Sequence, residues 1–169
     1  MKKLSRNLIR YFLILLLVIW MIVIFMFSAQ QSQQSSNMSG GVSYKIVTIC
    51  EGIVGKTFDG DEKARIISKI NYPIRKIAHM TEFAILACLM MSVLISYGIN
   101  ERKRVELISI IFTFLYACTD EFHQLFVPGR EGKFLDVMID TCGATAGVLV
   151  LTFLIYLFEK NNIILYKTV

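Results

Sequence analysis

The chain has 169 residues, of which 55% are apolar and 18% charged, whereas ordinary globular domains are about 45–50% apolar and about 25% charged. This composition argues against both a disordered chain and a soluble monomer, and favours a protein that faces lipid. The net charge is +5, and the basic residues lie in segments that flank apolar runs. This distribution indicates membrane topology and not nucleic-acid binding. The four cysteines form no Cys-x-x-Cys pair that would indicate a disulfide framework or a zinc site.

The first predicted element is a membrane span over residues 11–27, a charge-free apolar run. Four basic residues precede it, so a signal peptide is the alternative. Cleavage after Ala29 would place Phe27 at the −3 position, and cleavage after Ser28 would place Met26 there. Neither residue is small, so the run is expected to stay as an uncleaved span.

An outer segment, residues 28–75, follows this span. It begins with a Ser/Gln-rich stretch and Gly40-Gly41, which we expect to form a flexible connection. Two short amphipathic helices are predicted after it. One carries Val42, Ile46, Ile49 and Ile53 at helical spacing, and the other covers Asp61–Asn71. These helices would lie on the membrane surface or cap the bundle, or alternatively roof a site.

Three more spans are predicted over residues 77–97, 105–126 and 137–158, since each has the roughly 20 residues that a bilayer requires. A tight turn over residues 127–132 joins the last two. The predicted fold is therefore an all-α, four-span transmembrane bundle that forms a single domain over residues 1–169.

The distribution of basic residues predicts the orientation. Lys and Arg are divided evenly between the two sides, but they are denser at the N-terminus and in the 98–104 loop, because the segments on the other side are longer. Basic residues concentrate in cytoplasmic segments. Both termini are therefore expected in the cytoplasm.

With this topology, ionisable residues gather at the outer ends of three spans. Charges in hydrocarbon are costly unless they pair, meet water or bind a ligand. Helical spacing places Lys76, His79 and Glu82 near one face of span two. The other spans contribute Asp120, Glu121, His123, Gln124, Asp136 and Asp140.

Span four also contains a packing signal. Asp136, Asp140, Gly143 and Gly147 fall on one helical stripe. The two glycines form a GxxxG segment, which permits close helix approach in membranes. We therefore expect the aspartates to point into the bundle, with Gly143 and Gly147 as structural residues.

Several kinds of chemistry suit this cluster. His79, Glu82, Asp120 and Glu121 are candidate acid–base residues. Lys76 and Arg130 are candidate contacts for a phosphate or carboxylate. A divalent metal would suit the donor types, but no standard ligand spacing is present, so neither a metal nor a cofactor is assigned. A proton-relaying transporter is disfavoured because the chain has no internal repeat and no polar midplane.

The motifs resemble the VanZ-like family of bacterial membrane proteins. The resemblance rests on Phe25–Gln30 at the end of span one, on Arg75–Phe83 and, most specifically, on Asp120–Arg130, followed by Asp136 and Gly143. It extends over about residues 10–158. Two positions depart from the family pattern: Phe83 stands where tyrosine is common, and Asp140 where asparagine is common.

The resemblance implies a multi-pass cell-membrane protein linked to resistance to the glycopeptide antibiotic teicoplanin. Combined with the polar cluster, it predicts an outer-leaflet pocket that binds, and in one version modifies, an anionic envelope component such as a peptidoglycan precursor. The ligand contacts would be Lys76, His123, Gln124, Arg130, Asp136 and Asp140, with Pro128 and Gly129 shaping the turn. The alternative is a non-enzymatic membrane module whose polar cluster only holds the bundle together or docks a partner.

Overall fold

The computed structural model describes residues 2–30 and 32–160, which form five helices and no strand. They are α1 (Lys2–Ser28), α2 (Ser32–Val54), α3 (Gly60–Ser96), α4 (Arg102–Gln124) and α5 (Phe134–Lys160). The all-α prediction is confirmed for this part of the chain. Eleven residues of the predicted domain lie outside the described residues, namely Met1, residue 31 of the outer segment, and residues 161–169.

Three of the helices are long and apolar enough to cross a membrane: α1 over Arg6–Ser28, α3, and α5. The helix predicted as span three, α4, is not among them. Its apolar centre is flanked by Arg102, Lys103 and Arg104 at one end and by Asp120 and Glu121 at the other.

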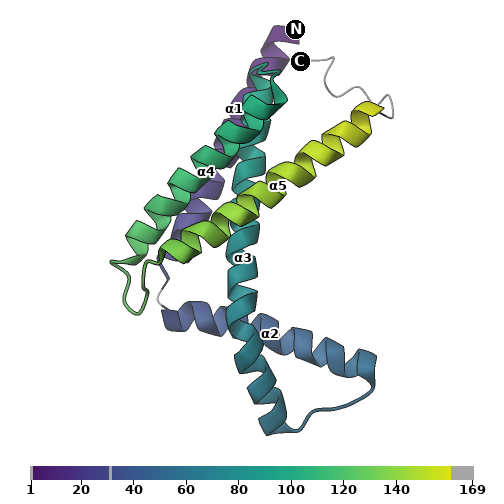
Figure 1. The fold of residues 1–169 in the computed structure, drawn as a ribbon, viewed down its shortest axis with the longest axis vertical. Coiled ribbons are helices and arrows are strands. Elements are labelled where there is room, and N and C mark those ends of the chain that lie inside the picture. Colours follow the sequence, from purple (N-terminus) through teal and green to yellow (C-terminus); the bar gives the residue numbers. More distant parts are fainter. Residues whose placement is uncertain (1, 31, 161–169) are drawn as a thin grey trace.

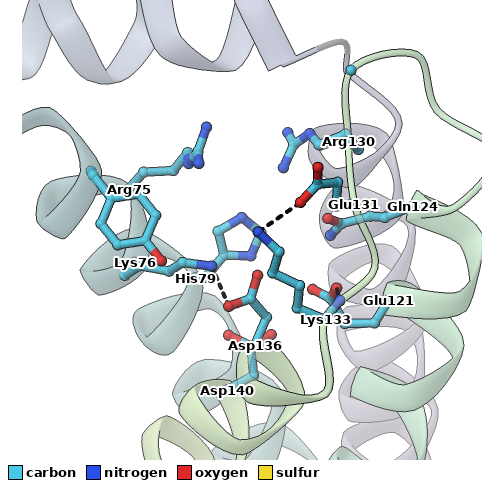
Figure 2. Close-up of a pocket in the computed structure, with 12 residues that line it drawn as sticks. Arg75, Lys76, His79, Glu121, Gln124, Arg130, Glu131, Lys133, Asp136 and Asp140 are labelled. Carbon is cyan, nitrogen blue, oxygen red and sulfur yellow. Dashed lines mark hydrogen bonds and ion pairs between the residues drawn. The ribbon is translucent and has the colours of Figure 1, made fainter.

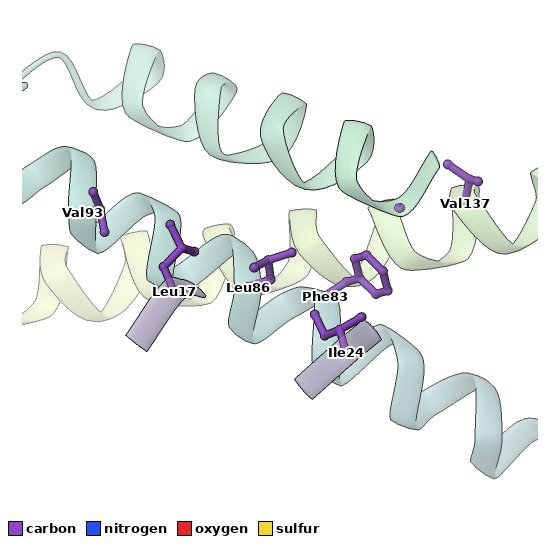
Figure 3. Close-up of a cluster of buried hydrophobic side chains, with 7 residues drawn as sticks. Leu17, Ile24, Phe83, Leu86, Val93 and Val137 are labelled. Carbon is purple, nitrogen blue, oxygen red and sulfur yellow. The ribbon is translucent and has the colours of Figure 1, made fainter. Parts of the chain in front are cut away.

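Helices α1, α3, α4 and α5 pack side by side, with α3 in contact with all the others (Figure 1). The core between them contains Leu17 and Ile24 of α1 with Phe83 and Leu86 of α3 (Figure 3). Helix α1 begins and α5 ends at one end of the bundle, where Arg102 pairs with Glu159 at 3.0 Å. The connection between α4 and α5 lies at the opposite end, near α2.

The second short helix predicted in the outer segment does not exist as a separate element. Helix α3 starts at Gly60, where the Asp59 side chain accepts the Gly60 N–H at 2.7 Å and caps the helix. It continues through Pro73 to Ser96. Its 37 residues span about 55 Å, well above the roughly 30 Å of a hydrocarbon core. The predicted start of span two at residue 77 therefore lies inside a continuous helix, and no break in the helix marks it.

The Ser/Gln-rich stretch is also helical, and not the flexible connection that its composition suggested. It forms the first half of α2, in which Ser39 and Ser43 are buried. The Ser43 hydroxyl donates to the Ser39 carbonyl at 2.8 Å, and the Asn71 amide of α3 donates to the Ser36 carbonyl at 3.3 Å. Small side chains that satisfy their own hydroxyls allow α2 to pack across α3.

Outside the core, large apolar side chains of α1 and α5 are exposed. Examples are Phe12 (59%) and Ile22 (54%) on α1, and Leu149 (59%) and Phe153 (57%) on α5. Apolar surface of this extent is typical of a membrane-facing protein, which agrees with the lipid environment expected from composition.

Candidate functional site

A polar cavity of about 130 Å³ lies where α3, the end of α4, the α4–α5 turn and the start of α5 meet (Figure 2). We call it the polar pocket. Its lining residues are Tyr72, Arg75, Lys76, His79, Glu121, Gln124, Gly129, Arg130, Glu131, Lys133, Asp136 and Asp140.

The turn between α4 and α5 supplies one wall. The Arg130 N–H donates to the Val127 carbonyl at 3.0 Å, and Gly129 has a φ of +74°. Proline as the second residue and a positive-φ glycine as the third fit a type II turn, so Pro128 and Gly129 suit the positions that they occupy. The Arg130 side chain is further held by its Nε, which donates to the Gln30 carbonyl at 3.2 Å.

Two glycines bring α5 against α3. A Cβ at Gly143 would collide with the Met80 backbone, and one at Gly147 would lie 2.7 Å from the Ala84 carbonyl oxygen. The GxxxG segment is thus the contact between the two helices. This contact places Asp136 and Asp140 of α5 next to Lys76 and His79 of α3.

The lysines of the pocket already have carboxylate partners. Lys76 of α3 pairs with Asp136 of α5 at 2.5 Å, and both side chains are mostly buried. Lys133 pairs with Glu131 at 2.7 Å in an exposed position, and its backbone N–H donates to the Glu121 carboxylate at 2.9 Å. These contacts neutralise the lysine charges and tie the helices together.

The two arginines of the polar pocket, unlike its lysines, are not paired with a carboxylate in the described part of the chain. Among the described residues, no ion pair with a carboxylate involves Arg75 or Arg130. Figure 2 shows both side chains reaching toward the same part of the cavity, above His79. Burial and the nearby Arg75 guanidinium lower the pKa of Arg130, although a guanidinium stays protonated at neutral pH. Neighbouring carboxylates partly offset this lowering of the Arg130 pKa. Two facing cations without a directly paired carboxylate form a site that favours an anion.

The acidic residues are divided between different surroundings. Asp140 lines the pocket and is 2% exposed, and its Oδ2 has no hydrogen-bond partner. Asp120 is equally buried but does not line the pocket, and it accepts a hydrogen bond from Gln124 at 3.1 Å. An unpartnered buried carboxylate oxygen suits a ligand hydroxyl or a water molecule.

Eight of the residues predicted for the site or its turn line the pocket: Lys76, His79, Glu121, Gln124, Gly129, Arg130, Asp136 and Asp140. Glu82 does not; its carboxylate lies 3.9 Å from His79 Nδ1, and its backbone carbonyl accepts the Trp20 indole N–H at 2.9 Å. His123 also lies elsewhere, with its ring centroid 4.3 Å from that of Phe25.

Sequence reasoning missed Tyr72, Arg75, Glu131 and Lys133. Arg75 and Tyr72 were assigned to the outer segment because the sequence pattern did not indicate that the helix of span two continues back through these residues. The signal was the helical spacing itself, since Tyr72 is four residues from Lys76, and Arg75 is four from His79.

Phe83, where the family often has tyrosine, is a core residue. It is fully buried, and its ring lies 6.2 Å from that of Tyr116. The Tyr116 hydroxyl donates to the Met21 carbonyl at 2.6 Å. The side chain at position 83 therefore contributes packing and does not line the pocket.

No group of three His, Cys, Asp or Glu side chains in the described ranges is arranged to hold a metal ion. The polar pocket combines cations, carboxylates and one imidazole, which are the types of group used in anion binding and in acid–base chemistry.

The sequence comparisons agree with the motifs. A family model described as VanZ/LLP1 matches residues 12–157, which is most of the chain. This match confirms the resemblance to VanZ-like proteins. No curated protein sequence and no solved structure matches the chain.

Proposed function

The chain belongs to the VanZ/LLP1 family, and on this basis we propose that it is a cell-envelope membrane protein whose polar pocket binds an anionic envelope component such as a peptidoglycan precursor. The pocket lies at the outer leaflet, and occupancy lowers susceptibility to glycopeptide antibiotics of the teicoplanin type. The antibiotic link comes from the family resemblance, and the anionic ligand comes from the pocket.

One observation supports the proposal that the ligand is an anion. Arg75 and Arg130 face one cavity without carboxylate partners, whereas the neighbouring Lys76 and Lys133 are both paired. Arginine binds phosphate and carboxylate groups through two parallel N–H donors. An anion between the two guanidiniums would relieve their mutual repulsion.

The proposal includes four membrane crossings. Helix α4 packs with α1, α3 and α5, and its charges are confined to its two ends. A helix that packs against other spans can cross with a shorter apolar centre, since its charged ends reach the interfaces. The polar pocket then lies on the side opposite to the basic 98–104 loop.

The candidate acid–base residues divide by position. His79 and Glu121 line the pocket and can contact a bound ligand. Glu82 and Asp120 lie outside it, so their influence would pass through His79 and Gln124. Binding is the proposed function, and any bond-breaking step would depend on His79 and Glu121.

The binding proposal is tested with Arg75→Gln and Arg130→Gln in the full-length protein. Purified protein is titrated with a short-chain probe, ethyl phosphate, and cells expressing each variant are assayed for teicoplanin susceptibility. Each substitution is expected to weaken binding by roughly 10- to 100-fold, because a hydrogen bond to a charged group contributes about 1.5–3 kcal/mol, and to lower resistance. Arg65→Gln, at an exposed position of α3 outside the pocket, is the matched control. Unchanged affinity in both pocket variants would refute the proposal.

A specific observation also favours the alternative function. The Lys76–Asp136 ion pair and the Glu121 bond to Lys133 link separate segments of the bundle. If the cluster serves only this purpose, His79→Ala and Asp120→Asn will remove the protein from the membrane. If the variants reach the membrane at normal levels but lose resistance, the cluster is a binding site.

A further inference from the structure

A second cavity, of about 250 Å³, lies beside the polar pocket, between the end of α1, the first half of α2 and the middle of α3. We call it the apolar groove. Most of its wall surface is apolar and comes from Phe27, Met38, Val42, Ile74 and Ala78, while Gln30, Ser35, Ser39 and Glu82 also line it. Met38 is 51% exposed and Val42 is 49% exposed, so this surface is open to an apolar ligand.

The apolar groove and the polar pocket share three residues. Arg75, His79 and Arg130 line both cavities. The two guanidiniums that have no carboxylate partner among the described residues therefore lie at the junction between the polar pocket and the apolar groove. A charged group held there would direct any attached chain along the groove.

Helix α2 is fixed firmly enough to act as the outer wall of the apolar groove. Glu51 of α2 pairs with Lys63 of α3 at 2.7 Å, and the Lys63 ammonium also donates to the Thr48 hydroxyl at 3.0 Å. Nearer to the groove, Asn71 of α3 donates to the Ser36 carbonyl. These contacts hold α2 across α3 with the apolar groove between them.

We propose that the ligand of this protein is an anionic lipid, with a phosphate-bearing head group between Arg75 and Arg130 and its apolar chain in the apolar groove. This inference rests on the proposed function and names its ligand class. A soluble anion would leave the groove in contact with water, which is unfavourable for apolar surface. A peptide would place unpaired backbone polar groups against the apolar wall. A lipid has the charge for one cavity and the chain for the other.

The length of the ligand's alkyl chain is the variable that tests the lipid assignment. Delipidated full-length protein in one detergent is titrated with ethyl phosphate, tetradecyl phosphate and tetradecanol. We expect tetradecyl phosphate to bind at least 10-fold more tightly than ethyl phosphate, and tetradecanol not to compete with it. Because long chains also partition into micelles, the wild-type preference must be compared with that of variants in the same detergent.

The variants Ala78→Trp and Val42→Trp fill the apolar groove from its two sides. Each is expected to bring the affinity for tetradecyl phosphate down to that for ethyl phosphate, while ethyl phosphate binding stays at the wild-type level. Ala64→Trp, at an exposed position of α3 that does not line the groove, should keep the full preference.

Two results would overturn the lipid assignment. One is an unchanged chain-length preference in both groove-filling variants. The other is an equal loss of ethyl phosphate and tetradecyl phosphate binding. In either case, the proposal that the polar pocket binds an anion would still stand if the wild type binds ethyl phosphate and this binding depends on Arg75 and Arg130. Absence of ethyl phosphate binding in the wild type would refute the proposed function itself.

Discussion

Position 143 shows how a single missing side chain brings the site together. The nearest atoms to a Cβ built there belong to the Met80 backbone, which cannot move aside as a flexible side chain can. The close approach of α5 to α3 at this point is what lets Asp136 reach Lys76. Packing inside the bundle and the arrangement of the polar pocket are therefore linked through one residue.

Gly143→Ala is expected to destabilise the protein by about 1–3 kcal/mol, the usual cost of overpacking. Thermal or denaturant unfolding in detergent measures the change. Gly52→Ala is the control, because Gly52 lies in α2 with no atom within 4 Å of an added Cβ, and alanine favours a helix. Equal stability of Gly143→Ala and the wild type would show that the two helices do not meet at this glycine.

The Lys76–Asp136 pair gives a second prediction at the residue scale. Both side chains are mostly buried, and removal of one partner of a buried pair leaves an uncompensated charge, at a cost of about 3–5 kcal/mol. Lys76→Met and Asp136→Leu should each destabilise the protein. The double variant should recover much of the loss, as the free energies of unfolding in a double-mutant cycle will show. Strictly additive losses would contradict a direct pair.

At the scale of elements, the sequence predicted the helical class, the four long helices and the tight turn, because apolar runs and a Pro-Gly pair are strong local signals. The length of α3 could not be predicted in the same way. Its first turns carry charged residues and Pro73, which read locally as a loop, yet packing against α2 keeps the helix continuous.

For the candidate site, the sequence indicated which residues share a helix face but not how each helix is rotated toward its neighbours. The spacing of Lys76 and His79, and of Asp136 and Asp140, correctly indicated residues on one side of a helix. The rotation of α4 about its axis is set by tertiary packing, so spacing alone did not separate Gln124, which lines the pocket, from His123, which packs on Phe25.

The attachment of α2 to α3 yields a pH prediction. The hydrogen bond from Lys63 and the Phe58 N–H lower the pKa of Glu51. The folded state therefore holds the carboxylate more strongly than the unfolded state. This contribution to stability is fully present above the ordinary glutamate pKa, about 4.3, and is lost as the pH falls through the lower pKa of the folded state.

We expect Glu51→Gln to increase hydrogen–deuterium exchange in α2 at pH 6, and the difference from the wild type to shrink as the pH falls below about 4. Exchange rates are corrected for the intrinsic effect of pH. Glu131→Gln, which removes a more exposed ion pair with Lys133 away from α2, should leave α2 exchange unchanged. A difference that grows on acidification would contradict the role of the Glu51 carboxylate.

At the scale of the whole molecule, the length of α3 determines where the site lies. About 20 of its residues suffice to cross the hydrocarbon, so roughly 25 Å of the helix projects beyond it. The polar pocket and the apolar groove are both lined by residues 72–82, in the middle part of α3. In the proposed arrangement, a lipid in the adjoining leaflet would enter from the side without leaving the membrane.

The orientation of the bundle decides which leaflet that is. The density of basic residues at the N-terminus and in the 98–104 loop predicts that this end of the bundle lies in the cytoplasm. The α4–α5 turn lies at the opposite end of the bundle. In a variant with alanine in place of the four free cysteines, Glu131→Cys should react with a membrane-impermeant maleimide in intact cells. Glu101→Cys, also exposed, should react only after the cells are opened. The reverse pattern would place the pocket in the cytoplasmic leaflet and exclude an outer-leaflet ligand, whereas the predicted pattern places the two arginines where envelope lipids are found.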